Sequence, residues 1–371
     1  MTYGKNDNKI VERASERASE QASKRIEWLD SLKGFATIAV VLGHVLLGYT
    51  ENNAFGQYNE LFLRLKDWIY IWHMPLFMGL SGFSFALAYY RNSQLDTVRV
   101  KKQILNLILL YMIFSILLYG LKIPLTMFTD NKMSLPDALV NLFFPNTIMW
   151  YLWVLAAYYL IFVCRLNLVN LIVTKPGTIL GFLFAATVVQ KISEITIRWW
   201  LCFGNFTRLA FYFCLGVVLC VYRDKKKLRK KVYVVAGTAI VALHFLYYMI
   251  KVGSFSVFEL VSGAIVATLI VIFMFEIVSA YATQTFAMRL LAVLGKASLV
   301  IYLLHTYLVT AMKVVCIRVG LCSGLLMDIL VVVLSTVIPI TICYFVDFIR
   351  RNNRLVGTFF SPMKIVMKKS V

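Results

Sequence analysis

The composition of this 371-residue chain indicates a membrane protein. Hydrophobic residues make up 60% of the sequence, charged residues only 15%, and the mean hydropathy is +0.77. A soluble domain is excluded because one globular core cannot hide so many apolar side chains from water. The formal net charge of +20 is common in nucleic-acid binders, but here Lys and Arg lie in short runs between apolar segments. This pattern is typical of membrane-protein loops, so we expect the lipid bilayer as a partner and no nucleic acid.

The chain begins with a charged segment, residues 1–27, that contains the run ERASERASEQAS. It has too few apolar residues to form a core, so we expect a solvated, disordered cytoplasmic tail. It does not resemble a secretory signal, because the first apolar run starts only at residue 34 and further spans follow it. We expect a membrane domain over residues 28–350 and a basic cytoplasmic C-terminal tail over residues 351–371.

Ten apolar windows of about 20 residues are long enough to cross a bilayer as helices. We therefore predict an all-α polytopic membrane protein, a bundle of about ten transmembrane helices. Only short segments lie outside these windows, so any chemistry belongs to the bundle itself. The predicted spans are 34–50, 69–90, 104–123, 148–164, 171–190, 199–221, 232–250, 258–280, 291–312 and 325–346.

The distribution of basic residues predicts the orientation. A cytoplasmic N-terminus places 28 of the 38 Lys and Arg residues on the cytoplasmic side. Because cytoplasmic loops are enriched in Lys and Arg, this excess favours an even number of spans, with both termini in the cytoplasm of a plasma (inner) membrane protein. The seven cysteines are scattered without a C-x-x-C pair. We interpret them as small core residues and expect no metal site.

The first predicted span contains a polar stripe. Lys33 lies at its start, and His44 follows eleven residues later in a run that is otherwise almost entirely apolar. Eleven helical steps total about 1100°, about 20° more than three turns, and rise about 16 Å, so the two side chains share one face. Thr37 joins this face, and Asp30 precedes it near the membrane surface. Such a stripe is expected to face the bundle interior or a wet cavity.

The second predicted span contains HMPLFMGLSGF, which opens at His73. Pro75 removes one helical hydrogen bond, and the two glycines allow neighbouring backbones to approach closely. His73 is either a polar contact between helices or a member of an active site. Ser81 lies about 80° from His73 around the helix. It is a packing residue or a substrate contact rather than a nucleophile, because no G-x-S-x-G turn surrounds it.

The fourth predicted span is aromatic, with the run MWYLWVLAAYYL. The simplest interpretation is an interfacial belt and core. Alternatively, Trp150 and Trp153 line a sugar site. Farther along, Glu276 and Asp328 are acids within apolar spans. Each needs a partner, because an isolated charge in hydrocarbon is unfavourable.

The ninth predicted span begins with GKASLVIYLLH. Ser298, Tyr302 and His305 lie within about 60° of one another around the helix and form a second polar stripe. His305 has the same two interpretations as His73, and Ser298 is a packing residue or a substrate contact. His244 lies in VALHFLYYM without comparable companions. We expect it to hydrogen-bond a neighbouring helix.

Three of these stretches, LDSLKGFATIAVVLGH, WHMPLFMGLSGF and GKASLVIYLLH, occur in this order in the first, second and ninth spans. Together they resemble the signature blocks of the acyltransferase-3 family of integral membrane O-acyltransferases. The family's first-helix motif is a basic residue, ten residues and a histidine, which correspond here to Lys33 and His44. WYLWVLAAYYL and FYFCLGVVLC are similar to the family's middle segments, so the resemblance covers roughly residues 28–310.

The resemblance implies a ten-helix bundle that takes an acyl group, usually acetyl from cytoplasmic acetyl-CoA. It transfers this group to a hydroxyl of a surface glycan or lipid-linked saccharide. Acetyl-CoA is then a substrate, and no tightly bound cofactor is expected. Two features depart from the family pattern. Lys33 replaces the commoner Arg, which keeps the charge without the bidentate fork. The paired basic residues ahead of a Pro-Tyr in the third helix are absent, so Arg99, Lys101 and Lys102 are the nearest candidates to contact CoA phosphates, although a simple positive-inside run also explains them.

The chemistry of the residues fits acyl transfer. A hydroxyl that attacks a thioester needs a base, and imidazole, with an unperturbed pKa near 6.5, is suited to that role. We expect His44 to be the general base, with an acyl-imidazole intermediate as the less favoured variant. Lys33 is placed to meet the pyrophosphate or 3′-phosphate of CoA. We expect His73 or Tyr302 to donate a hydrogen bond to the developing oxyanion, and His305 to orient either partner.

Two other classes of protein share parts of this pattern. A secondary transporter or a lipid or saccharide flippase would share the ten spans and the polar stripes near the midplane. It predicts internal repeats, and the two halves of this chain show no convincing similarity. A non-enzymatic scaffold has no need for a lysine and a histidine three turns apart. The sequence therefore favours an O-acyltransferase.

Overall fold

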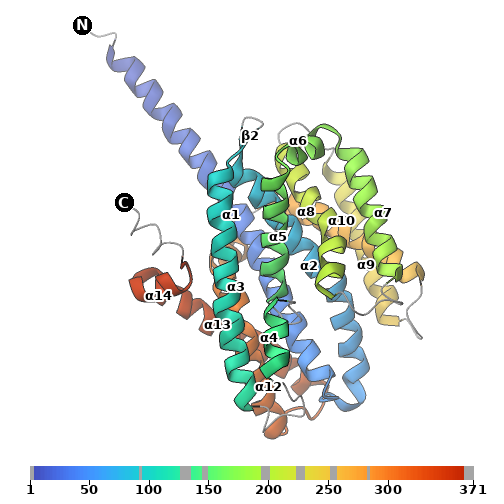
Figure 1. The fold of residues 1–371 in the computed structure, drawn as a ribbon. Coiled ribbons are helices and arrows are strands. Elements are labelled where there is room, and N and C mark those ends of the chain that lie inside the picture. Colours follow the sequence, from blue (N-terminus) through green and yellow to red (C-terminus); the bar gives the residue numbers. More distant parts are fainter. Residues whose placement is uncertain are drawn as a thin grey trace. The chain divides into compact units, whose positions relative to one another are not determined.

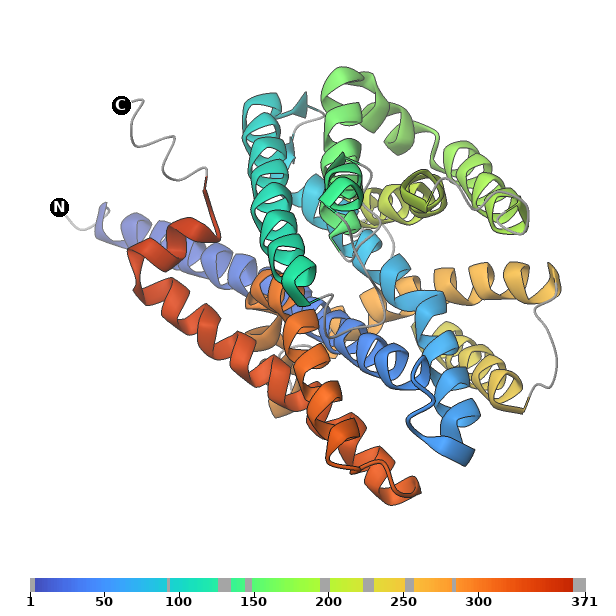
Figure 2. The same cartoon turned by 60° about the horizontal axis from the view of Figure 1, so that its bottom comes forward.

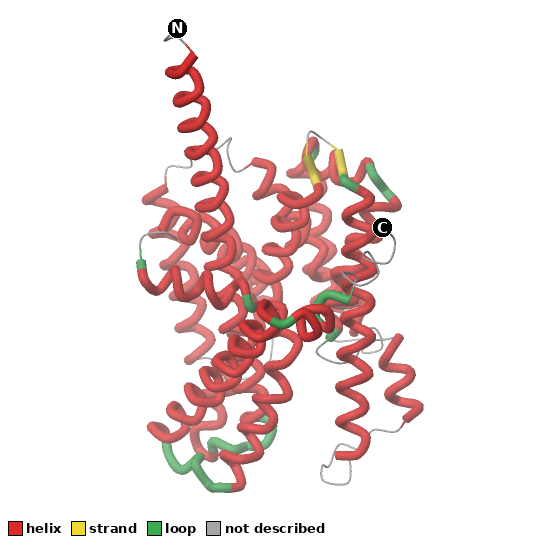
Figure 3. The backbone as a smooth tube through the Cα atoms, turned by 90° about the vertical axis from the view of Figure 1, so that its left-hand side faces the viewer, coloured by secondary structure: helices red, strands yellow, loops and turns green. Residues whose placement is uncertain are grey.

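The computed structural model is helical over nearly all of the residues it describes, with one short strand hairpin (Figure 3). The described residues are 4–91, 94–125, 135–143, 149–193, 201–222, 230–250, 257–281 and 285–362. The helices are α1 (Gly4–Thr50), α2 (Asn59–Tyr89), α3 (Thr97–Leu125), α4 (Leu135–Phe143), α5 (Trp150–Cys164), α6 (Asn167–Thr174), α7 (Pro176–Ser193), α8 (Leu201–Tyr222), α9 (Lys230–Ile250), α10 (Val257–Tyr281), α11 (Phe286–Lys296), α12 (Ser298–Arg318), α13 (Leu325–Asn352) and α14 (Arg354–Phe359). A 3₁₀ turn (Gly56–Tyr58) precedes α2, and β1 (Tyr90–Arg91) pairs antiparallel with β2 (Gln94–Leu95).

Among the described residues, seven helical segments are long and apolar enough to cross a membrane. They are Glu27–Thr50, Gly56–Tyr89, Thr97–Gly120, Gly204–Tyr222, Phe258–Ser279, Ser298–Arg318 and Leu325–Asn352. Helices α5 and α6 meet at an angle of 95°. If this bent pair is counted as one span, the number of candidate spans among the described residues rises to eight. The predicted class, an all-α polytopic membrane protein, is confirmed. The count of ten and the orientation stay predictions.

Two predicted spans differ from the observed helices. The span predicted at 291–312 starts too early, because α11 ends at Lys296 and Ala297 separates it from α12. The span predicted at 171–190 is divided between α6 and α7 at Lys175. Lys175 leaves the helical conformation, with φ −124° and ψ 54°, because the proline that follows disfavours that conformation in the preceding residue. Windowed hydropathy does not detect such single-residue breaks.

The N-terminal segment differs from the expected disordered tail, since Figure 1 shows α1 as one helix from Gly4 onward. Alanine, glutamate, glutamine and arginine, which dominate ERASERASEQAS, are strong helix formers. The helix therefore passes without a break from the charged segment into the apolar one.

The predicted C-terminal tail over residues 351–371 is described only up to residue 362 and stays a prediction beyond it. Helix α13 continues to Asn352, and Figure 2 shows α14 turning away from its end. The Asn353 side chain caps α14 by accepting a hydrogen bond from the Leu355 N–H at 2.9 Å. The rings of Phe359 and Phe360 lie 5.3 and 5.6 Å from that of Phe114 in α3, so this short helix is packed.

The chain forms two compact units. The first comprises Met1–His73, Lys231–Met249 and Leu269–Tyr344, and the second comprises Met74–Lys230, Ile250–Thr268 and Phe345–Val371. Helices α2, α10 and α13 therefore each contribute residues to both units.

In the first unit, α1 packs directly against α11. A Cβ atom on Gly34 would lie 1.9 Å from the Leu291 carbonyl oxygen, and one on Gly295 would lie 1.8 Å from the Asp30 carbonyl oxygen. Only glycine permits backbones to approach this closely. The Ser31 hydroxyl adds a hydrogen bond to the Met288 carbonyl at 2.8 Å. This contact places α1 beside the start of α12.

Aromatic rings hold the first part of α2 in the same unit. Trp72 stacks on Phe35 of α1, with ring centroids 5.8 Å apart and planes 14° apart. Trp68 contacts Trp72 at 5.6 Å and Phe245 of α9 at 5.0 Å. The α2 segment is thereby fixed between α1 and α9.

The second unit has an aromatic core. Phe85 of α2 lies 4.8 Å from Tyr159, 5.2 Å from Phe162 and 5.7 Å from Phe213 of α8, measured between ring centroids. A Cβ atom on Gly82 would lie 1.9 Å from the Phe213 carbonyl oxygen, so α2 and α8 also meet through small residues. Contacts between these large rings, together with the close approach at Gly82, connect α2 with α5 and α8.

Substituting Gly34→Ala should lower the stability of the protein, because the added methyl group requires α1 and α11 to separate. We expect a loss of about 1–3 kcal/mol or more, typical of overpacking, measured as the change in thermal unfolding in detergent. Gly181→Ala in α7 is the control, since an added Cβ meets nothing within 4 Å there. It should be neutral or stabilising. Equal stability of both variants would contradict the close α1–α11 contact.

Candidate active site

Helix α1 runs unbroken through Lys33 and His44, as the polar stripe requires. The Lys33 ammonium lies 3.8 Å from an Asp30 carboxylate oxygen, one helical turn earlier. Thr37, on the same face, donates its hydroxyl hydrogen to the Lys33 carbonyl at 2.7 Å. Asp30 is 8% exposed, so the ion pair lies partly out of water. Two of the predicted substrate contacts are thus partners of each other.

His44 lies beside His305 of α12, with ring centroids 5.2 Å apart and planes at 47°. His305 is fully buried, whereas His44 is half-buried. Two of the three predicted catalytic histidines, far apart in the sequence, are therefore in direct contact. The packing of α1 on α11 and the short turn at Ala297 bring these two helices together.

The hydrogen bonds of His305 define its tautomer. Its Nδ1 lies 2.8 Å from the Ile301 carbonyl oxygen and 3.0 Å from that of Tyr302. A carbonyl oxygen only accepts, so Nδ1 must be the nitrogen with the hydrogen. In the neutral ring Nε2 is then an acceptor. This buried Nε2 has no hydrogen-bond partner among the described residues.

His73 has the same tautomer, because its Nδ1 lies 2.8 Å from the Ile69 carbonyl oxygen. Neutral His73 therefore has its one N–H committed to its own helix. The predicted role of His73 as a hydrogen-bond donor to an oxyanion requires a hydrogen on Nε2, which the neutral ring in this tautomer does not have.

Tyr70 connects the histidines and was missed by the sequence analysis. Its ring lies 4.7 Å from that of His73, at 62°, and 6.3 Å from that of His44, at 77°. The available signal was the three-residue spacing from His73, which places both side chains on the same side of α2.

The remaining predicted residues of the first unit lie on α12. The Tyr302 ring is 6.4 Å from the His305 ring, at 41°. Ser298 is the first residue of the helix, nearly two turns before His305. Tyr302 therefore adjoins the histidine pair, whereas no contact of the Ser298 side chain with these rings is observed in the part of the chain that the structure describes.

Ser81 belongs to the second unit, where its hydroxyl is already engaged. It donates to the Phe77 carbonyl at 2.9 Å, and the Tyr151 hydroxyl lies 2.5 Å from it. Ser81 has a single hydrogen, so Tyr151 must be the donor of the second bond. These two bonds account for Ser81 without a substrate.

The predicted basic contacts also lie in the second unit, at the start of α3. The Arg99 side chain is 3.9 Å from an Asp96 carboxylate oxygen and lies over the Tyr89 ring at 5.9 Å. Lys101 and Lys102 are exposed. Among the described residues, no group of three or more His, Cys, Asp and Glu side chains could hold a metal ion.

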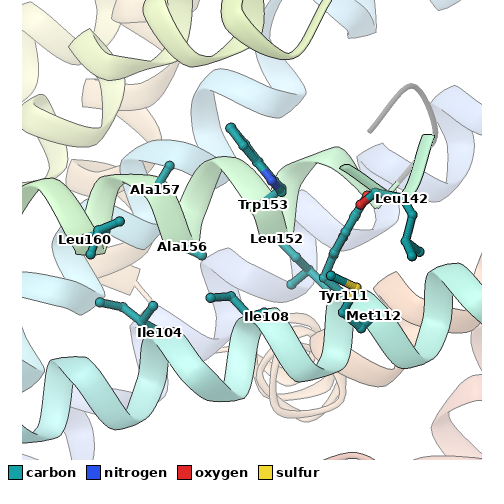
Figure 4. A pocket seen from close by; sticks show the side chains of 10 residues that line it. All are labelled: Ile104, Ile108, Tyr111, Met112, Leu142, Leu152, Trp153, Ala156, Ala157 and Leu160. Atoms are coloured by element: carbon teal, nitrogen blue, oxygen red, sulfur yellow. The ribbon is translucent and has the colours of Figure 1, made fainter. Parts of the chain in front are cut away.

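Trp153 lines a cavity of about 240 Å³ between α3 and α5 (Figure 4). Its lining is apolar apart from the Trp153 indole N–H and Tyr111, whose hydroxyl hydrogen is shared by the Asn141 and Leu142 carbonyls at 3.0 and 2.9 Å. Figure 4 shows Trp153 projecting from α5 away from α3. Trp150 is not part of the lining. Such walls suit hydrocarbon better than a sugar, which needs several hydrogen-bonding groups.

The arrangement of a lysine and two facing histidines in a membrane bundle can be compared with known proteins. A family model described as an acyltransferase domain, acyltransferase-3, matches residues 26–347. The chain belongs to this family. No curated protein and no solved structure matches the chain. The match starts just before the Asp30–Lys33 pair of this acyltransferase and ends within α13, so it includes His44, His73 and His305.

Substituting Ser81→Ala in this acyltransferase should lower stability, because the Tyr151 hydroxyl loses the acceptor in Ser81. A loss of about 1–2 kcal/mol is expected in thermal unfolding. Ser81→Thr keeps the hydroxyl and should retain more of the stability. A Ser81→Ala protein that is as stable as the parent but inactive would instead assign Ser81 to substrate binding.

Proposed function

We propose that this acyltransferase moves an acyl group from cytoplasmic acyl-CoA to a hydroxyl of a cell-surface glycan or lipid-linked saccharide, and that the acyl group is acetyl. The observation that most supports this is the contact of His44 with His305 of α12. His44 lies on α1, which also holds Lys33 about 16 Å away along the same face. A cation and a base so spaced suit a donor with phosphates at one end and a thioester at the other.

Lys33 is the proposed contact for a phosphate of CoA. Its ammonium is a compact charge with three donors, and a phosphate oxygen accepts strong charge-assisted hydrogen bonds. Asp30, 3.8 Å away, holds the ammonium in position before the donor binds. Arg99 and Lys102, in the second unit, stay predicted contacts for a CoA phosphate.

His44 is the proposed general base. Among the described residues, none forms a hydrogen bond with its ring, so the imidazole is available to a substrate hydroxyl. The hydroxyl oxygen attacks the thioester carbonyl carbon as its proton moves to His44. The C–S bond then breaks, and His44 returns the proton to the departing sulfur. CoA leaves as the thiol, and the histidine is neutral again.

His305 is the proposed positioning residue. It is fully buried and its Nδ1 hydrogen is bonded to the backbone of α12, so its ring cannot turn without breaking those bonds. A fixed ring 5.2 Å away limits the orientations of the more exposed His44. We further propose that both termini lie in the cytoplasm, that the membrane is a plasma (inner) membrane, and that the reaction uses no tightly bound cofactor.

Substituting His44→Ala should abolish acyl transfer. General-base catalysis contributes about 10²- to 10⁴-fold to a rate, so the acetyl mass increment on the host's envelope glycan should disappear from the mass spectrum. His244→Ala is the control, because His244 is buried in the same unit against Tyr248. It should acetylate normally. If His44→Ala is present in the membrane at the parental level and acetylates as well as the parent, His44 is not the general base. If the parent moves a saccharide across the membrane without acetylating it, a flippase is favoured instead.

Substituting Lys33→Ala should weaken acyl-CoA binding about tenfold or more, the effect of losing one charged hydrogen bond. Calorimetry on the purified protein with acetyl-CoA measures this. Arg350→Ala is the matched control, because Arg350 is also paired with an aspartate, Asp347, at 2.7 Å. Its affinity should equal that of the parent. Equal losses in both variants would show a general charge effect instead of a phosphate contact at Lys33.

A further inference from the structure

The hydroxyl of Tyr70 is a buried polar group without a described partner. Its oxygen is buried and forms no hydrogen bond with any residue that the structure describes. Buried polar groups in native proteins are nearly always hydrogen-bonded, so such a group needs an explanation, and a catalytic role is one of the recognised ones.

The position of this ring is built into the neighbouring helix. A Cβ atom on Gly43 would lie 3.1 Å from Cε2 of Tyr70, so the glycine beside His44 lets the tyrosine ring lie against α1. On the other side, the Lys66 ammonium lies over the ring at 5.8 Å, and Asp67 fixes that ammonium. The ring is thus held next to His44 by contacts that do not use its hydroxyl.

The histidines near Tyr70 have their N–H groups committed to backbone carbonyls. The two described ring neighbours of His44 are His305 and Tyr70. The N–H of neutral His305 is bonded to backbone carbonyls, as is that of His73. Of the two neighbours, only Tyr70 has a donor hydrogen left for a substrate. The unpartnered indole N–H groups of Trp68 and Trp72 are each two residues from Tyr70, about 160° away around α2.

We propose that Tyr70 is a catalytic residue that donates a hydrogen bond to the acyl carbonyl oxygen while His44 takes the proton of the attacking hydroxyl. This inference rests on the proposed acyl transfer. Negative charge develops on that oxygen as the acceptor adds to the thioester carbon. Tyr70 keeps its proton throughout and contributes a hydrogen bond that strengthens in the transition state. The bond that forms is still the C–O bond of the new ester, and the bond that breaks is still the C–S bond of the thioester.

A buried donor without a ground-state partner suits this role. It need not break an existing bond when the carbonyl oxygen becomes an oxyanion, so little reorganisation opposes the reaction. The Tyr70 and His44 ring centroids are 6.3 Å apart and the ring planes 77° apart, an edge contact that sets the two side chains next to each other.

Tyr70→Phe separates catalysis from structure. The hydroxyl has no described hydrogen bond to lose, so its removal should leave the thermal unfolding midpoint equal to or above that of the parent. The rate should fall, because loss of an oxyanion donor costs about 10²- to 10³-fold in kcat. A tyrosine with a merely structural role would show no such split.

The experiment uses the purified full chain, acetyl-CoA with a radiolabelled acetyl group, and the host's envelope glycan fraction as the acceptor probe. Label in the glycan gives kcat, the KM for acetyl-CoA and the half-saturating glycan concentration. For Tyr70→Phe we expect kcat to fall about 100-fold or more. The KM for acetyl-CoA and the half-saturating glycan concentration should both stay within about twofold of the parental values. Ser115→Ala, which removes another buried hydroxyl without a described partner, should match the parent.

Three results would overturn the proposal. The first is a kcat loss below about threefold in Tyr70→Phe. The second is a rise in the half-saturating glycan concentration with kcat unchanged, which would mean that Tyr70 contacts the acceptor. The third is a large kcat loss in Tyr302→Phe with Tyr70→Phe active, which would assign the donor to Tyr302. A parent protein that places no label in the glycan overturns the acyl-transfer proposal as well, so the two failures are distinguishable.

Discussion

Glycines at positions 34 and 295 allow the backbones of α1 and α11 to touch, and the histidine arrangement depends on that contact. Helix α12 starts one residue after α11 ends, so a fixed α11 also fixes the start of α12 beside α1. His305 then meets His44 at 5.2 Å. Close packing of small residues brings helix backbones together over a short distance, and here it holds this geometry.

The polar groups around His44 are specified by hydrogen bonds within single helices. His73 and His305 each bond a carbonyl oxygen four residues earlier through Nδ1. These bonds satisfy part of each ring in an apolar surrounding and determine which nitrogen has the hydrogen. As a consequence both neutral rings present an acceptor beyond their own helix. Charge stabilisation by a neutral donor must then come from a different type of side chain, such as a tyrosine hydroxyl.

The second unit contributes a different kind of surface. Its hydroxyl groups at Ser81 and Tyr111 are occupied by local bonds, and the cavity beside Trp153 is apolar. Aromatic residues in a membrane helix are compatible with both a sugar platform and a hydrocarbon wall, so the residue types alone could not decide between them. The neighbours of Trp153 favour a hydrocarbon wall, because a sugar requires several hydrogen-bonding partners and these walls supply few.

The sequence by itself determined the membrane class, the family and the shared face of Lys33 and His44. These features depend on composition, on ordered motifs and on the helical period, all of which are local along the chain. The tertiary structure alone decided that His44 meets His305, that Tyr70 contacts both His44 and His73, and that Ser81 is bonded to Tyr151. Such pairings depend on which faces of distant helices pack together, and helical periodicity specifies a face without specifying its partner.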